Sequence, residues 1–280
     1  MSYDFNPLVT IITPCYNDGD YIVECVKSVQ ESSYKNIEHI IVDDGSDDYT
    51  KQILSKIPYT NVQIIYQTNN GVCCARNSAI MQARGEIILP VDGDDKIGKD
   101  YIGKAVKVFG ENPNVRIVAS EISQYFGLSN SQLKVKRSLN VADFLSRNMI
   151  CSSSFFYRND AIKVGGFDED FKKGLEDWNF WVSLLELGGK IGVVPGTNVF
   201  IRVKRSSRNK SFSSETMREL VKLIWEKHKH LYSEYYADPY ETDSYLSLLL
   251  HDNMSWSKLT LLRLKAKIRR LFLELCKINK

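Results

Sequence analysis

The 280-residue sequence lacks the features that mark several special classes of protein. No apolar run reaches the roughly 18 residues that a membrane-spanning helix needs. The net charge of +3 is too small to indicate nucleic-acid binding, and the four histidines are not spaced like metal ligands. None of the six cysteines forms a Cys-x-x-Cys pair and no secretory leader precedes them, so we expect reduced thiols and a cytoplasmic location.

The first 97 residues alternate between short apolar runs and helical patterns, with enough hydrophobic residues in the chain for one large core or two modest ones. Continuous apolar strands separated by helices indicate a parallel sheet covered on both faces, and therefore an α/β fold. Strands are predicted at residues 8–13, 37–44, 62–68 and 86–91, and helices at 20–31, 46–57 and 71–84. We expect Asp18 or Asp20 to cap the first helix, and Ser46 or Asp47 the second.

The second half of the sequence is less regular. We predict a helix at 101–113, a strand at 115–126, a loop or hairpin at 128–137, a short helix at 141–148, a strand at 150–158, a helix from Glu176, two short strands within 190–204 broken by Pro195 and Gly196, and helices from about residue 212.

Polar clusters follow three of the predicted strands: "PCYND", "DDGSDD" and "DGDD". Ligands of parallel sheets bind beyond the carboxyl ends of the strands, so these clusters predict a site. The last cluster holds Asp92, Asp94 and Asp95, which repel one another unless a cation lies between them. Mg²⁺ and Mn²⁺ prefer such oxygen ligands, so a metal site is predicted, with a solvated turn as the alternative.

Other side chains at this edge suit a nucleotide. Asp43 or Asp44 could accept hydrogen bonds from a base or ribose, or one of them could cap the next helix. Tyr16 offers a flat ring for stacking a base, or is an ordinary rim tyrosine. Arg76 could reach a phosphate, or neutralise the acidic edge.

Two later segments suit an acceptor and a diphosphate. Glu176 and Asp177 stand at a helix start, where an acid either interacts favourably with the helix dipole or supplies a general base. Trp178 and Trp181, three residues apart on one helix face, would then form the wall of an acceptor pocket. The basic segment 201–211, which contains Arg202 and Lys204, could close over a diphosphate or be a solvated loop.

Together these residues carry a resemblance to a known family. The segments "VTIITPCYND", "IIVDDGSDD", "GVCCARNSAIMQARGEIILPVDGDD", "GGFDED" and "LEDWNFWVSLLELGG" occur in the order and spacing of family 2 glycosyltransferases. The resemblance covers about residues 7–211 and implies a GT-A fold, a Rossmann-like, mostly parallel sheet flanked by helices. It implies a nucleotide-sugar-binding half at 1–97 and an acceptor-binding half at 98–211, followed by a helical C-terminal extension at 212–280.

The resemblance also implies an inverting, metal-dependent sugar transfer to an acceptor hydroxyl, in the assembly of a cell-surface polysaccharide or glycan. The donor would be a nucleotide-diphosphate sugar, first of all a UDP-sugar, and the acceptor a glycan or a lipid-linked glycan, with no nucleic acid. The implied roles are base binding by Pro14, Tyr16, Asp43 and Asp44, nucleotide binding by Arg76, ribose and Mg²⁺ or Mn²⁺ binding by Asp92 and Asp94, a share in the metal for Asp95, a catalytic base in Asp177, and acceptor or diphosphate contacts by Glu176, Trp178, Arg202 and Lys204. Lys204 stands where members often carry a histidine, so the role of that segment is less defined.

The tail and two competing functions complete the analysis. Residues 258–280 form a basic amphipathic pattern, which either lies on the inner face of an anionic membrane or packs on the domain or on a second copy in a homodimer. A sugar-nucleotide nucleotidyltransferase shares the α/β fold but usually has a basic first loop, which "TPCYNDGD" does not provide. A receiver domain would need an aspartate in "VQIIYQTNN", where none stands.

Overall fold

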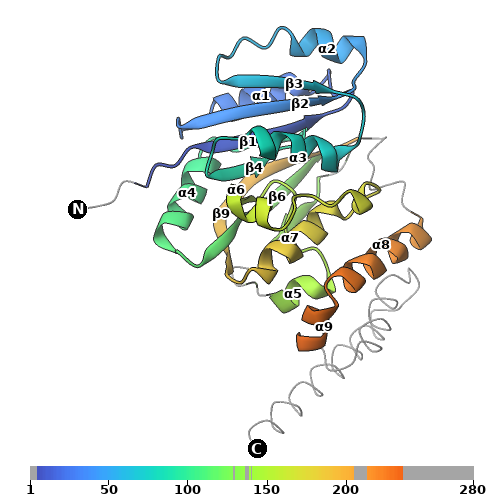
Figure 1. Cartoon of the computed structure of the whole chain (residues 1–280). Coiled ribbons are helices and arrows are strands. Elements are labelled where there is room, and N and C mark those ends of the chain that lie inside the picture. The colour runs from blue at the N-terminus through green and yellow to red at the C-terminus, as the bar shows by residue number, and fades with distance from the viewer. Residues whose placement is uncertain (1–4, 129, 136–138, 140, 205–212, 236–280) are drawn as a thin grey trace, which may run out of the picture.

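The computed structural model describes residues 5–128, 130–135, 139, 141–204 and 213–235. Across these residues the strands form one nine-stranded sheet in the order β3-β2-β1-β4-β8-β6-β9-β5, with β7 paired antiparallel to β6. Strands β3, β2, β1 and β4 can be followed in this order in Figure 1. Their bounds are β1 Val9–Cys15, β2 Ile37–Asp44, β3 Val62–Gln67, β4 Ile87–Pro90, β5 Lys96–Ile97, β6 Val115–Gly127, β7 Gln132–Lys134, β8 Phe155–Tyr157 and β9 Lys190–Val203.

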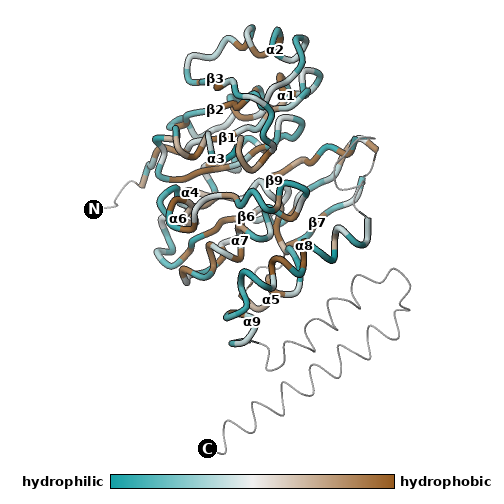
Figure 2. Tube along the Cα trace, turned by 45° about the vertical axis from the view of Figure 1, so that its right-hand side comes forward, coloured by the Kyte–Doolittle hydropathy of each residue, from teal (hydrophilic) through white to brown (hydrophobic). Residues whose placement is uncertain are grey.

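The four strands of the first half pair in parallel, as the sequence predicts. Helices cover both faces of this sheet: α1, Ile22–Gln30, and α4, Tyr101–Glu111, enclose one core with the strands, whereas α3, Val72–Gln82, and α7, Glu176–Glu186, enclose the other. The remaining helices are α2 Asp48–Leu54, α5 Val141–Ser146, α6 Arg158–Lys163, the 3₁₀ turn Glu169–Phe171, α8 Ser214–Lys227 and α9 Lys229–Tyr235. Hydrophobic stretches follow the central strands in Figure 2.

Capping agrees with the prediction at one helix and disagrees at another. Asp47 accepts a hydrogen bond from the Thr50 backbone N–H at 2.8 Å and caps α2, as expected. The side chains of Asp18 and Asp20 do not cap α1, which begins after Tyr21 without a side-chain cap. The backbone carbonyl of Asp18 accepts the first N–H groups instead, so its carboxylate remains available for another contact.

The prediction of two short strands within 190–204 is wrong, because the single strand β9 runs through Pro195 and Gly196. Its register with β6 shifts there, from Ser120 opposite Val194 to Ile122 opposite Thr197. Pro195 and Gly196 occupy this irregularity, where proline costs no ladder hydrogen bond and glycine adopts its φ of 83°. The irregularity therefore keeps residues 201–203 in the sheet.

The strand predicted at 150–158 is shorter, and two small elements were not expected. Residues 150–154 are outside the ladder because their serines bond locally, as in the Ser154 hydroxyl to the Cys151 carbonyl at 2.9 Å. Helix α6 begins directly after β8, and β5 pairs antiparallel with β9. Because β8 lies between β4 and β6, strands from both predicted halves, residues 1–97 and 98–211, belong to one sheet.

The C-terminal part begins as predicted, with helices α8 and α9. Tyr232 of α9 is buried and donates from its hydroxyl to the Leu145 carbonyl at 2.8 Å, so this part packs against α5. Residues 258–280, with their predicted membrane or partner contact, lie outside the described residues. Among the helices that are described, none combines the length and the apolar character needed to cross a bilayer.

Candidate active site

The three polar clusters meet at the carboxyl edge of the parallel strands. The Asp47 backbone N–H donates to Asn17 Oδ1 at 2.8 Å, which joins the loops after β1 and β2. The Gly93 N–H donates to the Pro14 carbonyl at 3.3 Å, which joins the loop after β4 to the end of β1. A Cβ on Gly93 would lie 3.1 Å from Asp18 Oδ2, so glycine permits this close approach.

Each carboxylate of the "DGDD" segment has a separate partner, which is a basic side chain for Asp92 and Asp94 and a backbone amide for Asp95. Asp92 Oδ1 accepts from Arg76 Nη2 at 2.7 Å, and Asp94 Oδ2 lies 2.7 Å from Lys204 Nζ. Asp95 is buried, and its Oδ1 accepts from the Arg202 backbone N–H at 2.8 Å. Burial raises the pKa of Asp95 well above its usual range, and the neighbouring aspartates raise it further. Separate partners thus offset the repulsion among the three acids.

Lys204 joins the first cluster to the last. Its ammonium lies 2.9 Å from Asp18 Oδ1 as well as 2.7 Å from Asp94 Oδ2, beside the ring of Tyr21. Burial alone would lower the pKa of Lys204, but its contacts with Asp94 and Asp18 outweigh that effect and raise it. Two carboxylate oxygens, one from Asp18 and one from Asp94, therefore contact the same ammonium group.

This donor set fits a hard divalent cation in part. Mg²⁺ commonly takes one or two protein carboxylates and completes its shell with water and substrate phosphates. Asp94 and Asp18 can supply two such oxygens, whereas Asp95 is 4% exposed and accepts from the backbone. Within the described parts of the chain, no group of three His, Cys, Asp or Glu side chains gathers around one point. The predicted share of Asp95 in the metal stays a prediction, because the backbone contact occupies only its Oδ1.

Arg76 connects the two halves of the site. Its side chain, on α3, is 1% exposed; Nη2 binds Asp92 and Nη1 lies 3.1 Å from Glu176 Oε1 at the start of α7. The guanidinium also lies 5.0 Å from the centre of the Phe167 ring. Burial alone would lower the pKa of Arg76, but the two carboxylates raise it. Of the two predicted roles, the structure places the arginine as the neutraliser of the acidic edge.

Asp177 stands beside this ion pair on the first turn of α7. Its Oδ1 accepts from the Trp178 backbone N–H at 2.7 Å, and its Oδ2 accepts from Asn148 Nδ2 at 2.8 Å. Burial and the neighbouring Glu176 raise the pKa of Asp177 to about 6, against the lowering effect of Arg76. Leu175, just before this turn, has a φ of 61°, a costly conformation that concentrates at functional sites.

The aromatic wall predicted beside Asp177 does not agree with the structure. Trp178 is 5% exposed and donates from Nε1 to the Phe144 carbonyl at 2.6 Å, which holds α7 against α5. Trp181 is fully buried and packs edge-to-face on Phe156. Both rings belong to the core because α7 is covered on most sides, which its sequence pattern alone does not show.

Arg202 is part of strand β9, not of a flexible loop. Its guanidinium lies between the rings of Tyr21 and Phe126, at 4.6 and 4.5 Å from their centres, and donates to Glu24 Oε2 at 2.8 Å. This packing holds the end of β9 against the "DGDD" segment. Residues 205–211 of the predicted closing segment lie outside the described residues.

The residues predicted to bind the base differ in exposure. Tyr16 is 52% exposed at the end of β1, so its ring is accessible to a ligand. Asp43 is fully buried and accepts from the Ser46 N–H at 3.1 Å. Asp44 accepts from the backbone N–H groups of Asn70 and Gly71, at 2.9 and 2.8 Å. Neither aspartate caps α2 as the alternative proposed, and Asp44 instead orders the turn before α3.

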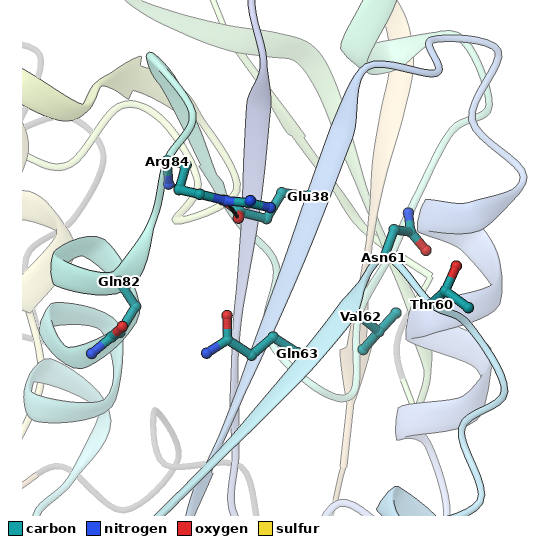
Figure 3. Close-up of a pocket in the computed structure, with 7 residues that line it drawn as sticks. All are labelled: Glu38, Thr60, Asn61, Val62, Gln63, Gln82 and Arg84. Carbon is teal, nitrogen blue, oxygen red and sulfur yellow. Dashed lines mark hydrogen bonds and ion pairs between the residues drawn. The ribbon is translucent and has the colours of Figure 1, made fainter.

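A second hollow lies at the opposite edge of the sheet, where β2 and β3 begin (Figure 3). Its only close charge pair among the drawn residues is Glu38 Oε1 with Arg84 Nε, at 2.6 Å. Thr10 and the Arg84 backbone also donate to Glu38. This carboxylate is thus occupied in closing the edge, and the hollow is separate from the site.

Comparison with known proteins decides the family. Residues 10–166, more than half of the chain, match the sequence profile of the family described as Glycosyl transferase family 2. The chain belongs to glycosyltransferase family 2. The resemblance predicted from five sequence motifs is thereby confirmed.

Its curated relatives match over part of their length. TuaG of Bacillus subtilis (strain 168), named for teichuronic acid biosynthesis, is 39% identical over 111 residues, 39% of this chain and 44% of TuaG. The glycosyltransferase GlyG of Streptococcus pneumoniae is 39% identical over 98 residues, 34% of this chain and 33% of GlyG. The succinoglycan biosynthesis protein ExoO of Rhizobium meliloti is 26% identical over 220 residues, 72% of this chain and 62% of ExoO. Each match spans less than two thirds of the relative.

Solved structures show the same fold. S. aureus TarS 1–349 in complex with UDP-GlcNAc superposes with a TM-score of 0.63 at 22% identity, over 77% of this chain and 66% of that one. The mannosyltransferase PcManGT of Pyrobaculum calidifontis, in complex with GDP-Man and Mn²⁺, gives a TM-score of 0.59 at 20% identity, over 95% of this chain and 81% of that one. The family has the GT-A fold, and the predicted α/β class is confirmed.

Sequence reasoning missed two residues of this site. Asp18 was interpreted only as a helix cap, although it belongs to the "PCYND" cluster whose position already predicts a site. Asn148 follows a short helix and lies in none of the motifs, so no signal in the sequence points to it. Only the fold brings it to Asp177.

Proposed function

We propose that this protein is an inverting, metal-dependent glycosyltransferase, which moves a sugar from a nucleotide-diphosphate sugar to an acceptor hydroxyl. One observation carries the proposal: Asp177, a carboxylate with a pKa of about 6, adjoins the arginine that binds Asp92 of the "DGDD" segment. A proton acceptor and an acidic, cation-binding edge therefore belong to one connected cluster. Membership of family 2 supports the same reaction.

In the proposed reaction Asp177 accepts the proton of the acceptor hydroxyl. The hydroxyl oxygen then forms a bond to the anomeric carbon from the face opposite the leaving group, and the bond from that carbon to the diphosphate oxygen breaks. The electron pair of the broken bond leaves with the nucleoside diphosphate. A single displacement with a single base inverts the anomeric configuration.

The residues of the acidic edge have separate proposed roles. Asp94, with Asp18, would hold Mg²⁺ or Mn²⁺, which neutralises charge on the leaving diphosphate. Asp92 would contact the ribose, Tyr16 and Pro14 the base, and Asp44 the base through the turn it orders. Arg202 and Lys204 would supply the positive charge around the diphosphate. Arg76 would neutralise Asp92 and hold the start of α7 through Glu176.

The relatives suggest the class of substrates. TarS and PcManGT bind UDP-GlcNAc and GDP-Man, so a UDP-sugar or GDP-sugar is the proposed donor. TuaG and ExoO are named for polysaccharide biosynthesis, so a growing glycan or a lipid-linked glycan is the proposed acceptor. We propose cytoplasmic action at the inner face of the membrane, with contact by residues 258–280, and leave homodimer formation as a further proposal for the same segment. The nucleotidyltransferase alternative has no support in the first loop, which holds no basic residue.

The test is a thermal-shift panel of UDP, GDP, UDP-GlcNAc and GDP-mannose, each with and without Mn²⁺. A ligand that binds only the native state at 100 times its Kd stabilises it by about 2.7 kcal/mol, which raises the midpoint by several degrees. We expect one nucleotide to raise the midpoint, only with Mn²⁺, in the wild type and not in Asp94→Asn. An Asp20→Asn variant is the control, because Asp20 is exposed and its Oδ1 accepts a hydrogen bond from the Tyr49 hydroxyl at 3.0 Å. No shift with any nucleotide would contradict the proposal.

A second prediction concerns Lys204. In Lys204→Met the carboxylate oxygens of Asp94 and Asp18 still point to one position, but the Lys204 ammonium no longer occupies it. We therefore expect Mn²⁺, without any nucleotide, to raise the unfolding midpoint of this variant. The wild type should show a smaller rise, because ammonium and metal compete for the same oxygens. Calcium-free buffer with and without 1 mM EDTA provides the baseline. Equal responses to Mn²⁺ would show that the metal binds elsewhere.

A further inference from the structure

Asn148 lies outside every motif of the family but contacts the proposed base. It belongs to the loop between α5 and β8, and its Nδ2 donates to Asp177 Oδ2 at 2.8 Å. The orientation of the amide is consistent at both ends: a carboxylate only accepts, so it faces the NH₂ group, and Asn148 Oδ1 faces the Ile150 backbone N–H at 3.4 Å. The side chain thus has one direction in which it meets both neighbours.

The loop that carries Asn148 is held in place on two sides. Before it, the carbonyls of Phe144 and Leu145 accept from Trp178 Nε1 and from the Tyr232 hydroxyl, at 2.6 and 2.8 Å. After it, Ile150 is 2% exposed and packs in the core. The donor to Asp177 therefore belongs to a part of the molecule tied to both α7 and α9.

We propose that Asn148 is the positioning residue for the general base, and that it fixes the plane of the Asp177 carboxylate toward the acceptor hydroxyl. The inference rests on the proposed function. With Oδ1 bound to the Trp178 N–H and Oδ2 bound to Asn148, rotation of the carboxylate would break one of two hydrogen bonds. The remaining lone pair on each Asp177 oxygen then points in a fixed direction, from which it can accept the proton of the acceptor hydroxyl. Correct orientation of a base contributes directly to rate.

The contact also affects the charge of Asp177. An N–H donated to a carboxylate favours its ionised form, and Asn148 lowers the pKa of Asp177 against the rise caused by burial and Glu176. Among the described residues, Arg76 and the Tyr125 phenol on β6 also interact electrostatically with Asp177. Removal of Asn148 therefore has two separable consequences: a less well oriented base, and a base that takes up its proton at higher pH.

The experiment compares Asn148→Ala and Asn148→Asp with the wild type and with Asn112→Ala. Asn148→Asp keeps the shape and replaces the donor with an acceptor. Asn112 is an exposed asparagine at the end of α4, and its Nδ2 donates to the Val108 carbonyl at 3.1 Å. One measurement is the titration of the Asp177 carboxyl carbon by NMR of protein labelled with ¹³C-aspartate, assigned by its loss in Asp177→Asn. The other is the pH dependence of UDP release from UDP-GlcNAc, or of GDP release from GDP-mannose if only that donor binds.

We expect Asp177 in Asn148→Ala to titrate about one pH unit higher than in the wild type, and in Asn148→Asp at least as high, since a hydrogen bond to a charged group is worth at least that much. We expect kcat to fall roughly tenfold to a hundredfold on the pH plateau, with the KM for the nucleotide sugar within about twofold of the wild type. Asn112→Ala should match the wild type in both measurements.

Two results would overturn the inference and leave the proposed function unaffected. If Asp177 titrates alike in the wild type and in Asn148→Ala, the contact does not exist in solution. If the titration moves but kcat on the plateau does not fall, Asn148 tunes the charge of Asp177 and does not position it. If the wild type releases nucleotide from neither sugar nucleotide, the proposed function fails and the inference falls with it, whatever the NMR titration shows.

Discussion

Asp177→Asn is expected to lose sugar transfer by about 10²- to 10⁴-fold while still binding the nucleotide. A positioned general base contributes a factor of this size, and an amide cannot accept the proton of the acceptor hydroxyl. The substitution keeps the shape of the side chain and removes one negative charge beside Glu176, so the fold should be retained. Nucleotide release from the sugar nucleotide that stabilises the protein most measures the loss.

The matched control for this variant is Glu186→Gln, at the other end of the same helix. Glu186 contacts His228 and His230, not the acidic edge, so its loss should leave turnover near the wild-type value. Nucleotide-dependent thermal stabilisation should be the same for all three proteins. An Asp177→Asn variant with more than a tenth of wild-type turnover would assign the base to another residue.

The pH dependence of the wild type follows from the same carboxylate. Because the pKa of Asp177 is raised to about 6, the base is protonated and inactive below that pH and ionised above it. A plot of log(kcat/KM) against pH should therefore rise with a slope of one below about pH 6 and level off above it. The pH dependence of kcat/KM reports the ionisable groups of the free enzyme. A profile that stays flat down to pH 5 would contradict the assignment of Asp177.

Arg76→Met is expected to cause the largest loss of stability among single substitutions at the site. The guanidinium is 1% exposed and lies between Asp92 and Glu176, and removing one partner of a buried ion pair costs about 3–5 kcal/mol. At about 2–4 °C per kcal/mol for a domain of this size, the unfolding midpoint should fall by roughly 10 °C. Methionine retains much of the stem, so the loss reports the charge more than the volume.

Arg84→Met is the control for this prediction, because Arg84 follows the same helix and pairs with Glu38 at 2.6 Å while its side chain is 78% exposed. Solvent screens the Arg84 end of the pair, and the buried Glu38 keeps its hydrogen bonds from the Thr10 hydroxyl and from the backbone N–H of residue 84. The midpoint should therefore change by less than about 3 °C. Differential scanning calorimetry of both variants at pH 7 makes the comparison. Equal midpoints would mean that Arg76 is not the cation on which the two carboxylates depend.

The sequence was sufficient for the parallel half of the fold because the local signals agree there. Short, mostly apolar runs such as residues 37–44 are typical of strands buried on both faces, and the first three are each followed by a helix. The positions of Asp92 and Asp94 relative to the sheet follow from that alternation. The same argument brings three polar clusters to one edge.

The rest depended on contacts between distant residues. Pro195 normally ends a strand, and only the register shift against β6 shows why β9 continues. Trp178 and Trp181 could line a pocket or a core with the same spacing, and packing of α5 on α7 decides for the core. The Arg76 bridge to Glu176 joins residues 100 positions apart, which no local pattern encodes.

The insertion of β8 between β4 and β6 has a consequence during synthesis on the ribosome. Ile87 of β4 pairs with Tyr157 of β8, 70 residues later in the chain, so one edge of the newly made parallel sheet has no neighbour until that segment emerges. At roughly 5–20 residues per second this interval lasts about 4–14 s. The edge that is unpaired in the nascent chain is β4, Ile87–Pro90, which is fully buried in the folded protein. An unpaired apolar strand edge is a template for pairing with other chains. Pro90, which offers no N–H, shortens that template at its end and so makes the nascent chain a poorer partner for aggregation.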